Sequence, residues 1–188
     1  MKKSLFILLA ALCCGLYSCE EDATWPLGEE QFEHAYYIGF KDWGKLKNDV
    51  VATVNKNSTI EVAVQFYSEF VRDYDVITKY YVTNIGFTGT AAAVFGTDYL
   101  IVDSIGNTLS TNADGAFEMV WPNAIKGVKK IYIKNVSTKT TAGSFYLQFF
   151  NPADATGITI TNRMNDSTAL YTVSAFTQNY RCKIIVNK

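Results

Sequence analysis

Few residues in this sequence have the types and spacing that catalysis needs. His34 is the one histidine, so any Ser-His-Asp or Cys-His arrangement would have to include it. The chain contains no Gly-x-Ser-x-Gly segment and no glycine-rich phosphate loop, and the residues after position 18 include only Cys19, Cys182 and His34, too few for the usual zinc site. The sequence alone does not exclude a pair of carboxylates that could cleave glycosides, so a hydrolase is the third-ranked function. We therefore expect a protein that is not an enzyme and needs no cofactor.

The N-terminal residues have the order of an export signal. Lys2 and Lys3 precede an apolar stretch over residues 5–12, and the small residue Ser18 stands directly before Cys19. A membrane-spanning helix needs about 20 apolar residues, and this stretch is shorter. The pattern predicts a signal peptide over residues 1–18 that is removed by cleavage before Cys19.

The cleavage region also predicts a lipid anchor. Leu16-Tyr17-Ser18-Cys19 resembles the lipobox of bacterial lipoproteins, in which diacylglycerol is attached to the cysteine sulfur. The resemblance implies that Cys19 is lipidated and that the protein meets a membrane through this lipid. Each methylene group buried in the bilayer contributes about 0.8 kcal/mol to membrane binding, and stable attachment requires more than one acyl chain. The alternative is an ordinary secretory signal in which Cys19 is an incidental thiol.

An acidic segment follows the predicted lipid anchor. Glu20-Glu21-Asp22 resembles the signal that sends lipoproteins of Bacteroidota to the outer face of the outer membrane. We interpret residues 19–30 as a flexible acidic tether and expect an outer-membrane protein on the cell surface. A site facing the periplasm is the alternative.

Composition favours a β-rich domain and disfavours a nucleic-acid partner. The chain has 12 Tyr, 12 Phe and 3 Trp but only 3 Pro, a bias that is typical of pleated strands. Its formal net charge is −1, and it has no basic run that could replace the counterions of a nucleic acid. We expect no nucleic-acid binding.

Alternation of apolar and polar residues predicts an all-β, antiparallel, immunoglobulin-like sandwich over residues 31–188. The two longest runs, 59–67 and 76–84, are predicted to form a hairpin. Strands after residue 150 are predicted to complete the same sheets, and Cys182 is predicted to be a core residue. The predicted strands are 35–40, 50–54, 59–67, 76–84, 116–121, 130–136, 144–150, 157–161, 170–176 and 183–186.

One stretch adds a family resemblance to this pattern. Gly96-Thr97-Asp98-Tyr99 is followed by Phe117–Ala124 and by the alternating run Gly127–Lys134. Together these segments resemble the Calx-β domain and its relatives of unknown function in lipoproteins of Bacteroidota, over about residues 50–150. Gly96 is suited to a positive φ, Asp98 can accept hydrogen bonds from backbone amides of the turn, and Tyr99 is suited to the core.

The resemblance raises the question of calcium, which some Calx-β domains bind through carboxylates in loops at one end of the sandwich. Calcium needs six to eight oxygen ligands. Residues 134–143 contain no acid, so we expect no metal site. The remaining weak candidates are Asp73, Asp75 and Asp98.

Aromatic side chains are the best sequence evidence for binding, since a ring can stack on the face of a sugar. We select Trp43, in a polar loop, together with Tyr74 and with Trp121, which is predicted to be half-buried. Each has an alternative role in the core. By analogy with surface polysaccharide systems of Bacteroidota, a glycan is the first ligand expected. The full set of candidate rings is Trp25, Trp43, Trp121, Tyr36, Tyr37, Tyr74, Tyr80 and Tyr81.

The alternative function is structural. In this hypothesis the protein is an adhesion or assembly subunit that joins another envelope protein through a sheet edge or a loop. An unprotected edge strand or a large apolar patch would favour it. Asp103-Ser104-Ile105 and Asp166-Ser167-Thr168 also resemble a short O-glycosylation motif of exported Bacteroidota proteins, which makes Ser104 and Ser167 candidate glycosylation sites.

Overall fold

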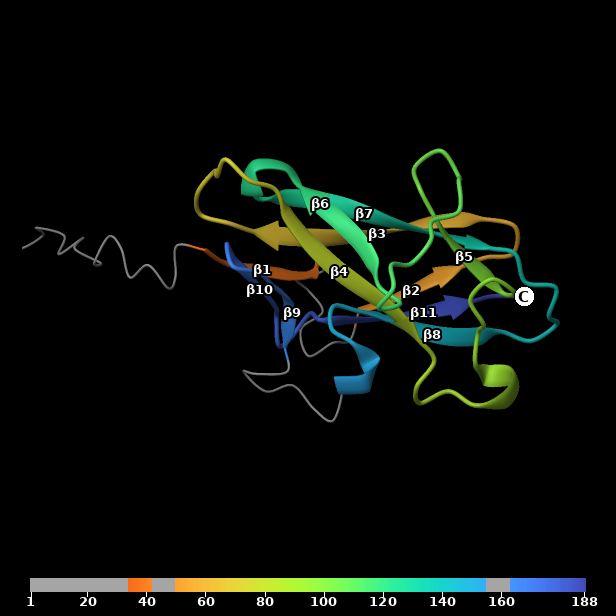
Figure 1. Cartoon of the computed structure of the whole chain (residues 1–188). Coiled ribbons are helices and arrows are strands. Elements are labelled where there is room, and N and C mark those ends of the chain that lie inside the picture. The colour runs from red at the N-terminus through yellow and green to blue at the C-terminus, as the bar shows by residue number, and fades with distance from the viewer. Residues whose placement is uncertain (1–33, 42–49, 155–162) are drawn as a thin grey trace, which may run out of the picture. The chain divides into compact units, whose positions relative to one another are not determined.

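A computed structural model describes residues 34–41, 50–154 and 163–188, which build two β-sheets that face each other as a sandwich (Figure 1). The order of the six-stranded sheet is β5 (Tyr99–Val102), β7 (Gly127–Asn135), β3 (Thr59–Tyr67), β1 (Ala35–Phe40), β10 (Thr172–Ala175) and β9 (Met164–Ser167). The order of the five-stranded sheet is β2 (Val50–Val54), β11 (Arg181–Val186), β8 (Gly143–Gln148), β4 (Val76–Thr83) and β6 (Phe117–Trp121). Short 3-10 turns are η1 (Gly89–Ala91), η2 (Pro122–Ala124) and η3 (Pro152–Asp154).

The all-β sandwich predicted from alternation is confirmed. Every second residue of each central strand points into the space between the sheets, because side chains alternate across a pleated strand. Burying one such large apolar side chain contributes about 1.5–3 kcal/mol. Cys182 lies in this core, as predicted. The fully buried residues of the core include Ile38, Val64, Phe66, Phe145, Leu147, Phe149, Val173 and Ile184.

The predicted hairpin of residues 59–67 with 76–84 is wrong. β3 pairs with β1 and β7 in one sheet, whereas β4 pairs with β6 and β8 in the other. Residues 68–75 carry the chain from one sheet to the other. Both strands bury one face. The alternation of apolar and polar residues predicts this buried face, but it does not predict which strand will pair with β3 or with β4.

The sheets are mixed and not wholly antiparallel, which corrects the prediction. β1 pairs in parallel with β10, and β2 pairs in parallel with β11. Two strands from the start of the domain therefore run parallel to two strands from its end, β1 beside β10 in the six-stranded sheet and β2 beside β11 in the five-stranded sheet. A close approach beside the end of β10 requires Gly39, because a Cβ there would lie 2.8 Å from Cδ2 of Phe176.

The C-terminal strands complete the same two sheets, as predicted, since β9 and β10 join the first sheet and β11 joins the second. The predicted strand over 157–161 lies outside the described residues. Two short strands, β5 and β9, were not predicted. Each has only four residues, and β9 has the polar sequence Met-Asn-Asp-Ser, in which alternation gives no signal.

The turn before β5 has the predicted conformation. Gly96 has a φ of +80°, and the backbone N–H of Val94 donates to Oδ2 of Asp98 at 2.8 Å. Tyr99 is 2% exposed, and its ring centroid lies 3.6 Å from that of Phe145 in a stacked pair. The motif therefore joins the two sheets through one aromatic contact.

Residues 34–188 group together as one compact unit by their contacts. The predicted signal peptide, Cys19, the tether over 19–30 and the predicted domain start at residue 31 lie outside the described residues. In the part of the chain that the structure describes, no helix is long and apolar enough to cross a bilayer.

Candidate ligand-binding cleft

The structure describes two of the three predicted ligand-binding rings, Tyr74 and Trp121. Trp43 lies outside the described residues. Tyr74 is half-buried in an aromatic cluster, where its hydroxyl forms hydrogen bonds with Nδ1 of His34 at 2.6 Å and with the hydroxyl of Tyr36 at 2.7 Å. Its ring stacks on that of Tyr171, with 6.0 Å between centroids. Burial and the hydrogen bond with Tyr36 raise the pKa of Tyr74, so its hydroxyl stays protonated at neutral pH.

Trp121 is a core residue, and the prediction that it is half-buried is wrong. Its side chain is 2% exposed, and its ring stacks on Phe66 with 4.8 Å between centroids. The indole N–H donates to Oγ1 of Thr78 at 2.9 Å. The ring is therefore not available to stack on a sugar. Trp121 is the last residue of β6, and η2 follows it directly.

The weak metal candidates lie at opposite ends of the sandwich. Oδ1 of Asp75 accepts a hydrogen bond from the N–H of Asn123, beside the end of β6. Asp98 precedes β5, where Tyr99 pairs with Asn135 at the far end of β7. The described residues contain no group of three His, Cys, Asp or Glu side chains that could hold a metal ion.

The carboxylate of Asp98 already has a full set of partners. Its Oδ2 lies 2.6 Å from Nζ of Lys139, and its Oδ1 accepts a hydrogen bond from Oγ of Ser137 at 2.9 Å. Desolvation by burial opposes ionisation, but these hydrogen bonds outweigh it and lower the pKa of Asp98. The ammonium of Lys139 supplies the positive charge that a cation would otherwise bring.

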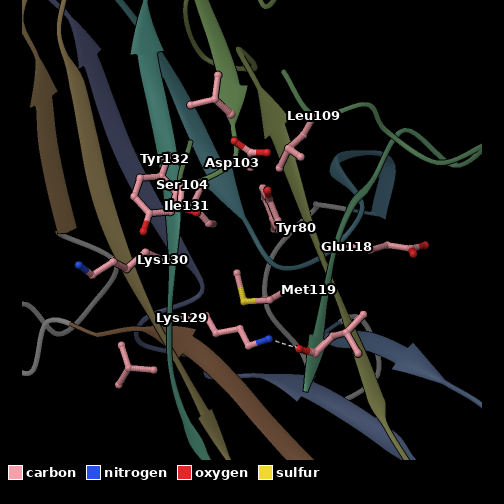
Figure 2. Close-up of a pocket in the computed structure, with 13 residues that line it drawn as sticks. Tyr80, Asp103, Ser104, Leu109, Glu118, Met119, Lys129, Lys130, Ile131 and Tyr132 are labelled. Carbon is pink, nitrogen blue, oxygen red and sulfur yellow. Dashed lines mark hydrogen bonds between the residues drawn. The ribbon is translucent and has the colours of Figure 1, made fainter. Parts of the chain in front are cut away.

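A different candidate site lies between β6 at the edge of the five-stranded sheet and β7 of the six-stranded sheet. A cleft of about 500 Å³ lies between β6 and the first half of β7 (Figure 2). β5 covers only the second half of β7, since its last residue, Val102, pairs with Tyr132. The cleft therefore lies between two strand edges, each of which belongs to a different sheet. The cleft is open to solvent over much of its surface.

Apolar side chains and the ring of Tyr80 lie at the floor of the cleft, and Ser104 and Tyr132 also line it. Met119, which is 9% exposed, and Ile131, which is 1% exposed, lie at the base of the cleft, and the ring of Tyr80 stacks on Phe117 with 5.2 Å between centroids. Tyr80 is 3% exposed, and its hydroxyl end points toward Asp103 and Leu109 (Figure 2).

The hydroxyl of Tyr80 has no hydrogen-bond partner among the described residues, and burial alone raises its pKa. It therefore stays protonated and can both donate and accept a hydrogen bond. The oxygen of Tyr80 is not one of the fully buried side-chain atoms that lack a partner, so water reaches it, and a ligand hydroxyl group could take the place of that water.

A lysine closes one end of the cleft. Nζ of Lys129 in β7 donates to the backbone carbonyl of Val120 in β6, shown as the dashed line in Figure 2. The same ammonium lies 5.3 Å from the centroid of the Trp121 ring. The aliphatic part of Lys129 therefore spans the gap between the two strand edges and forms a wall.

The other charged groups at the cleft also have partners within the protein. Lys130 forms an ion pair with Glu61, and this hydrogen bond raises the pKa of Lys130. Oε1 of Glu118 accepts a hydrogen bond from Nδ2 of Asn112 at 2.7 Å. Lys130 and Glu118 point away from the cleft in opposite directions (Figure 2).

Asp103 is held by its own turn. Oδ1 accepts hydrogen bonds from the N–H groups of Ile105 at 3.0 Å and Asn107 at 2.8 Å, and Oδ2 accepts one from Nδ2 of Asn107 at 2.9 Å. Desolvation acts against ionisation, but these hydrogen bonds hold the pKa of Asp103 below its ordinary value. The turn leaves Ser104 exposed at the rim of the cleft.

The edge of β6 offers backbone groups to the cleft. The N–H groups of Ile77 and Lys79 in β4 donate to side chains on the side away from β6. Val120 lies opposite Ile77 and Glu118 lies opposite Lys79. Both are therefore non-hydrogen-bonded pairs of the ladder between β6 and β4. The backbone groups of Val120 and Glu118 point to the free edge, where Lys129 occupies one carbonyl.

Two of the other edge strands, β5 and β9, have contacts within the domain, whereas β2 is the second edge of the five-stranded sheet and its Val51 is 54% exposed. β5 is flanked by the bridge of Val102 with Thr108, next to which the N–H of Leu109 donates to the carbonyl of Ile101 at 2.9 Å. β9 is joined to β4 of the other sheet by side chains, for Nζ of Lys79 lies 3.0 Å from Oδ1 of Asp166.

Sequence reasoning found part of this site. Tyr80 was among the aromatic candidates, but nothing in the sequence separates it from the rings that the core uses. The roles of Met119 and Lys129 were missed, because they depend on β6 and β7 lying on either side of a gap. The chain matches no protein-family model and shows no significant similarity to a curated protein.

Proposed function

We propose that this protein is a non-enzymatic binding module of the bacterial cell envelope, held at the outer membrane by lipid on Cys19, and that its ligand is a glycan. The export signal and the lipobox-like residues support the location. The observation that carries the binding function is the cleft with an apolar floor and the hydroxyl of Tyr80. A sugar ring has an apolar face and a rim of hydroxyl groups, so its surface complements both features.

The test uses the mature lipoprotein purified in detergent and a broad glycan array. We expect retention of at least one glycan class, and we expect Tyr80→Phe to weaken it about five-fold, which is the effect of losing one hydrogen bond. Tyr81→Phe is the matched control. Tyr81 is the next residue of β4, is also buried and does not line the cleft. No retention of any glycan by the intact protein would refute the proposal.

The structural alternative has one observation in its favour. The edges of β6 and of the first half of β7 both face the cleft, and an extended segment of another envelope protein would find backbone partners there. The ammonium of Lys129 on the carbonyl of Val120 opposes this, because a charged side chain on a sheet edge blocks strand addition. If strand addition is the function, Lys129→Ala will increase the recovery of crosslinked envelope complexes. A glycan-binding module predicts no such increase.

The Calx-β-like character of residues 50–150, the cell-surface orientation and the taxonomic origin stay predictions. Protease or antibody access to the protein on intact cells tests the cell-surface orientation. Degradation by external protease supports surface display, and full protection supports a site facing the periplasm.

A further inference from the structure

The charges around the cleft indicate which kind of glycan it accepts. Lys129, Lys130, Asp103 and Glu118 all line it, and the two positive charges balance the two negative charges. Each of these groups has a partner within the protein. An acidic or basic ligand would therefore have to break an existing interaction before it gained a new one.

The hydrogen bonds of these groups also keep them ionised. The pKa of Asp103 is lowered and that of Lys130 is raised, so neither becomes neutral near pH 7. An acidic sugar placed between them would meet the carboxylate of Asp103 as well as a lysine. Its carboxylate would also lose water above Met119 and Ile131, which cannot replace the lost hydrogen bonds.

An uncharged ring meets none of these costs. Its C–H face can contact Met119 and Ile131, and one of its hydroxyl groups can reach the hydroxyl of Tyr80 at the floor. The methylene groups of Lys129 add apolar surface at the closed end while its ammonium stays on the carbonyl of Val120.

We propose that the cleft between β6 and β7 selects an uncharged sugar ring, with the hydroxyl of Tyr80 as its polar anchor and the stem of Lys129 as its end wall. This inference rests on the proposed glycan-binding function and narrows it to neutral glycans. It also assigns the cleft as a place where the ligand is selected.

The experiment compares two sets of oligosaccharides of matched length, one neutral and one with uronic acid or sulfate groups, by calorimetry with the mature lipoprotein in detergent. We expect neutral oligosaccharides to bind and acidic ones to bind at least ten-fold more weakly. Binding is expected to change less than two-fold between low and high salt, because no ion pair forms with the ligand.

Variants locate the site. Tyr80→Phe should weaken neutral binding about five-fold with an unchanged melting temperature, and Tyr81→Phe should leave binding unchanged. Lys129→Met keeps most of the stem and should retain binding, whereas Lys129→Gly removes the wall and should weaken it. Lys129→Met that abolishes binding would overturn the assigned role of the stem.

The outcomes separate the two proposals. Tighter binding of acidic oligosaccharides, with strong salt dependence, would overturn the inference and leave the glycan-binding function standing. Equal effects of Tyr80→Phe and Tyr81→Phe would overturn the assignment of the cleft. No binding of either set would refute the proposed function itself.

Discussion

Oδ2 of Asp98 lies 2.6 Å from Nζ of Lys139, and this ion pair joins the turn before β5 to the loop after β7. The carboxylate side chain is 2% exposed and the lysine side chain 33% exposed. A buried carboxylate with one charged partner and additional hydrogen bonds depends on all of them, since removing the charged partner leaves an uncompensated charge.

Asp98→Asn is expected to lower the free energy of unfolding by about 2 kcal/mol, because it removes the charge from the hydrogen bonds to Lys139 and Ser137. Urea denaturation at pH 7 measures the change. The exposed Asp114→Asn is the control and should alter stability little. Equal stability of the two variants would show that the ion pair contributes nothing.

The same carboxylate predicts a pH dependence. Because the pKa of Asp98 is lower in the folded protein, its contribution to stability is complete above the unfolded value of about 3.9. That contribution is lost as the pH falls through the folded pKa. The stability difference between wild type and Asp98→Asn should therefore shrink below about pH 4. A difference that stays constant down to pH 2 would contradict this account.

Trp121→Ala should destabilise the domain by about 3–5 kcal/mol, the usual cost of removing a large buried ring. The indole packs on Phe66, and its N–H bonds to Thr78, so both contacts are lost. Thermal or urea unfolding measures the change. If Trp121→Ala folds with normal stability, the assignment of Trp121 to the core is wrong.

Trp43→Ala tests the exposed aromatic predicted from the sequence. If the ring stacks on a sugar, the variant should retain less glycan and keep the wild-type melting temperature. Retention is measured on the same array as Tyr80→Phe. Unchanged retention would leave the cleft as the ligand site and remove Trp43 from it.

The lipid on Cys19 is tested by mass spectrometry of the mature N-terminal peptide. We expect Cys19 to carry acyl chains, and we expect Cys19→Ser to leave the membrane fraction. An unmodified thiol at this position in the native protein would refute the proposed lipid anchor and the membrane location that depends on it.

Ser104 and Ser167 are tested as glycosylation sites in the same experiment. Ser104 is exposed in the turn that Asp103 holds, so a modifying enzyme can reach its hydroxyl. Ser104→Ala should remove a glycan mass from its peptide, and the exposed Ser110→Ala should not. Intact peptides of unmodified mass for both Ser104 and Ser167 in the native protein would reject both sites.

Much of the secondary structure was predictable because pleated strands alternate their side chains with a period of two. β1, β2 and β3 begin and end where the pattern predicts, and β4 differs by one residue. The turn around Gly96 and Asp98 was predictable for a local reason, since a positive φ and a carboxylate acceptor within five residues need no distant partner.

The candidate site was less predictable, and Trp121 and Tyr80 show why. Both are aromatic residues on alternating strands with apolar neighbours, and the sequence offers no difference between them. The N–H of Trp121 donates to Thr78, whereas the hydroxyl of Tyr80 has no hydrogen-bond partner among the described residues and lines the cleft. That distinction depends on which strand lies opposite.

By itself, the sequence determined the all-β class and the buried face of most strands, and it predicted an export signal, because each of these patterns lies in neighbouring residues. Only the tertiary structure decided that β3 and β4 belong to different sheets, that β1 and β2 run parallel to β10 and β11, and that a cleft opens between β6 and β7. Strand partners are chosen by contacts between residues far apart in the chain, and alternation is the same whichever partner and direction are chosen.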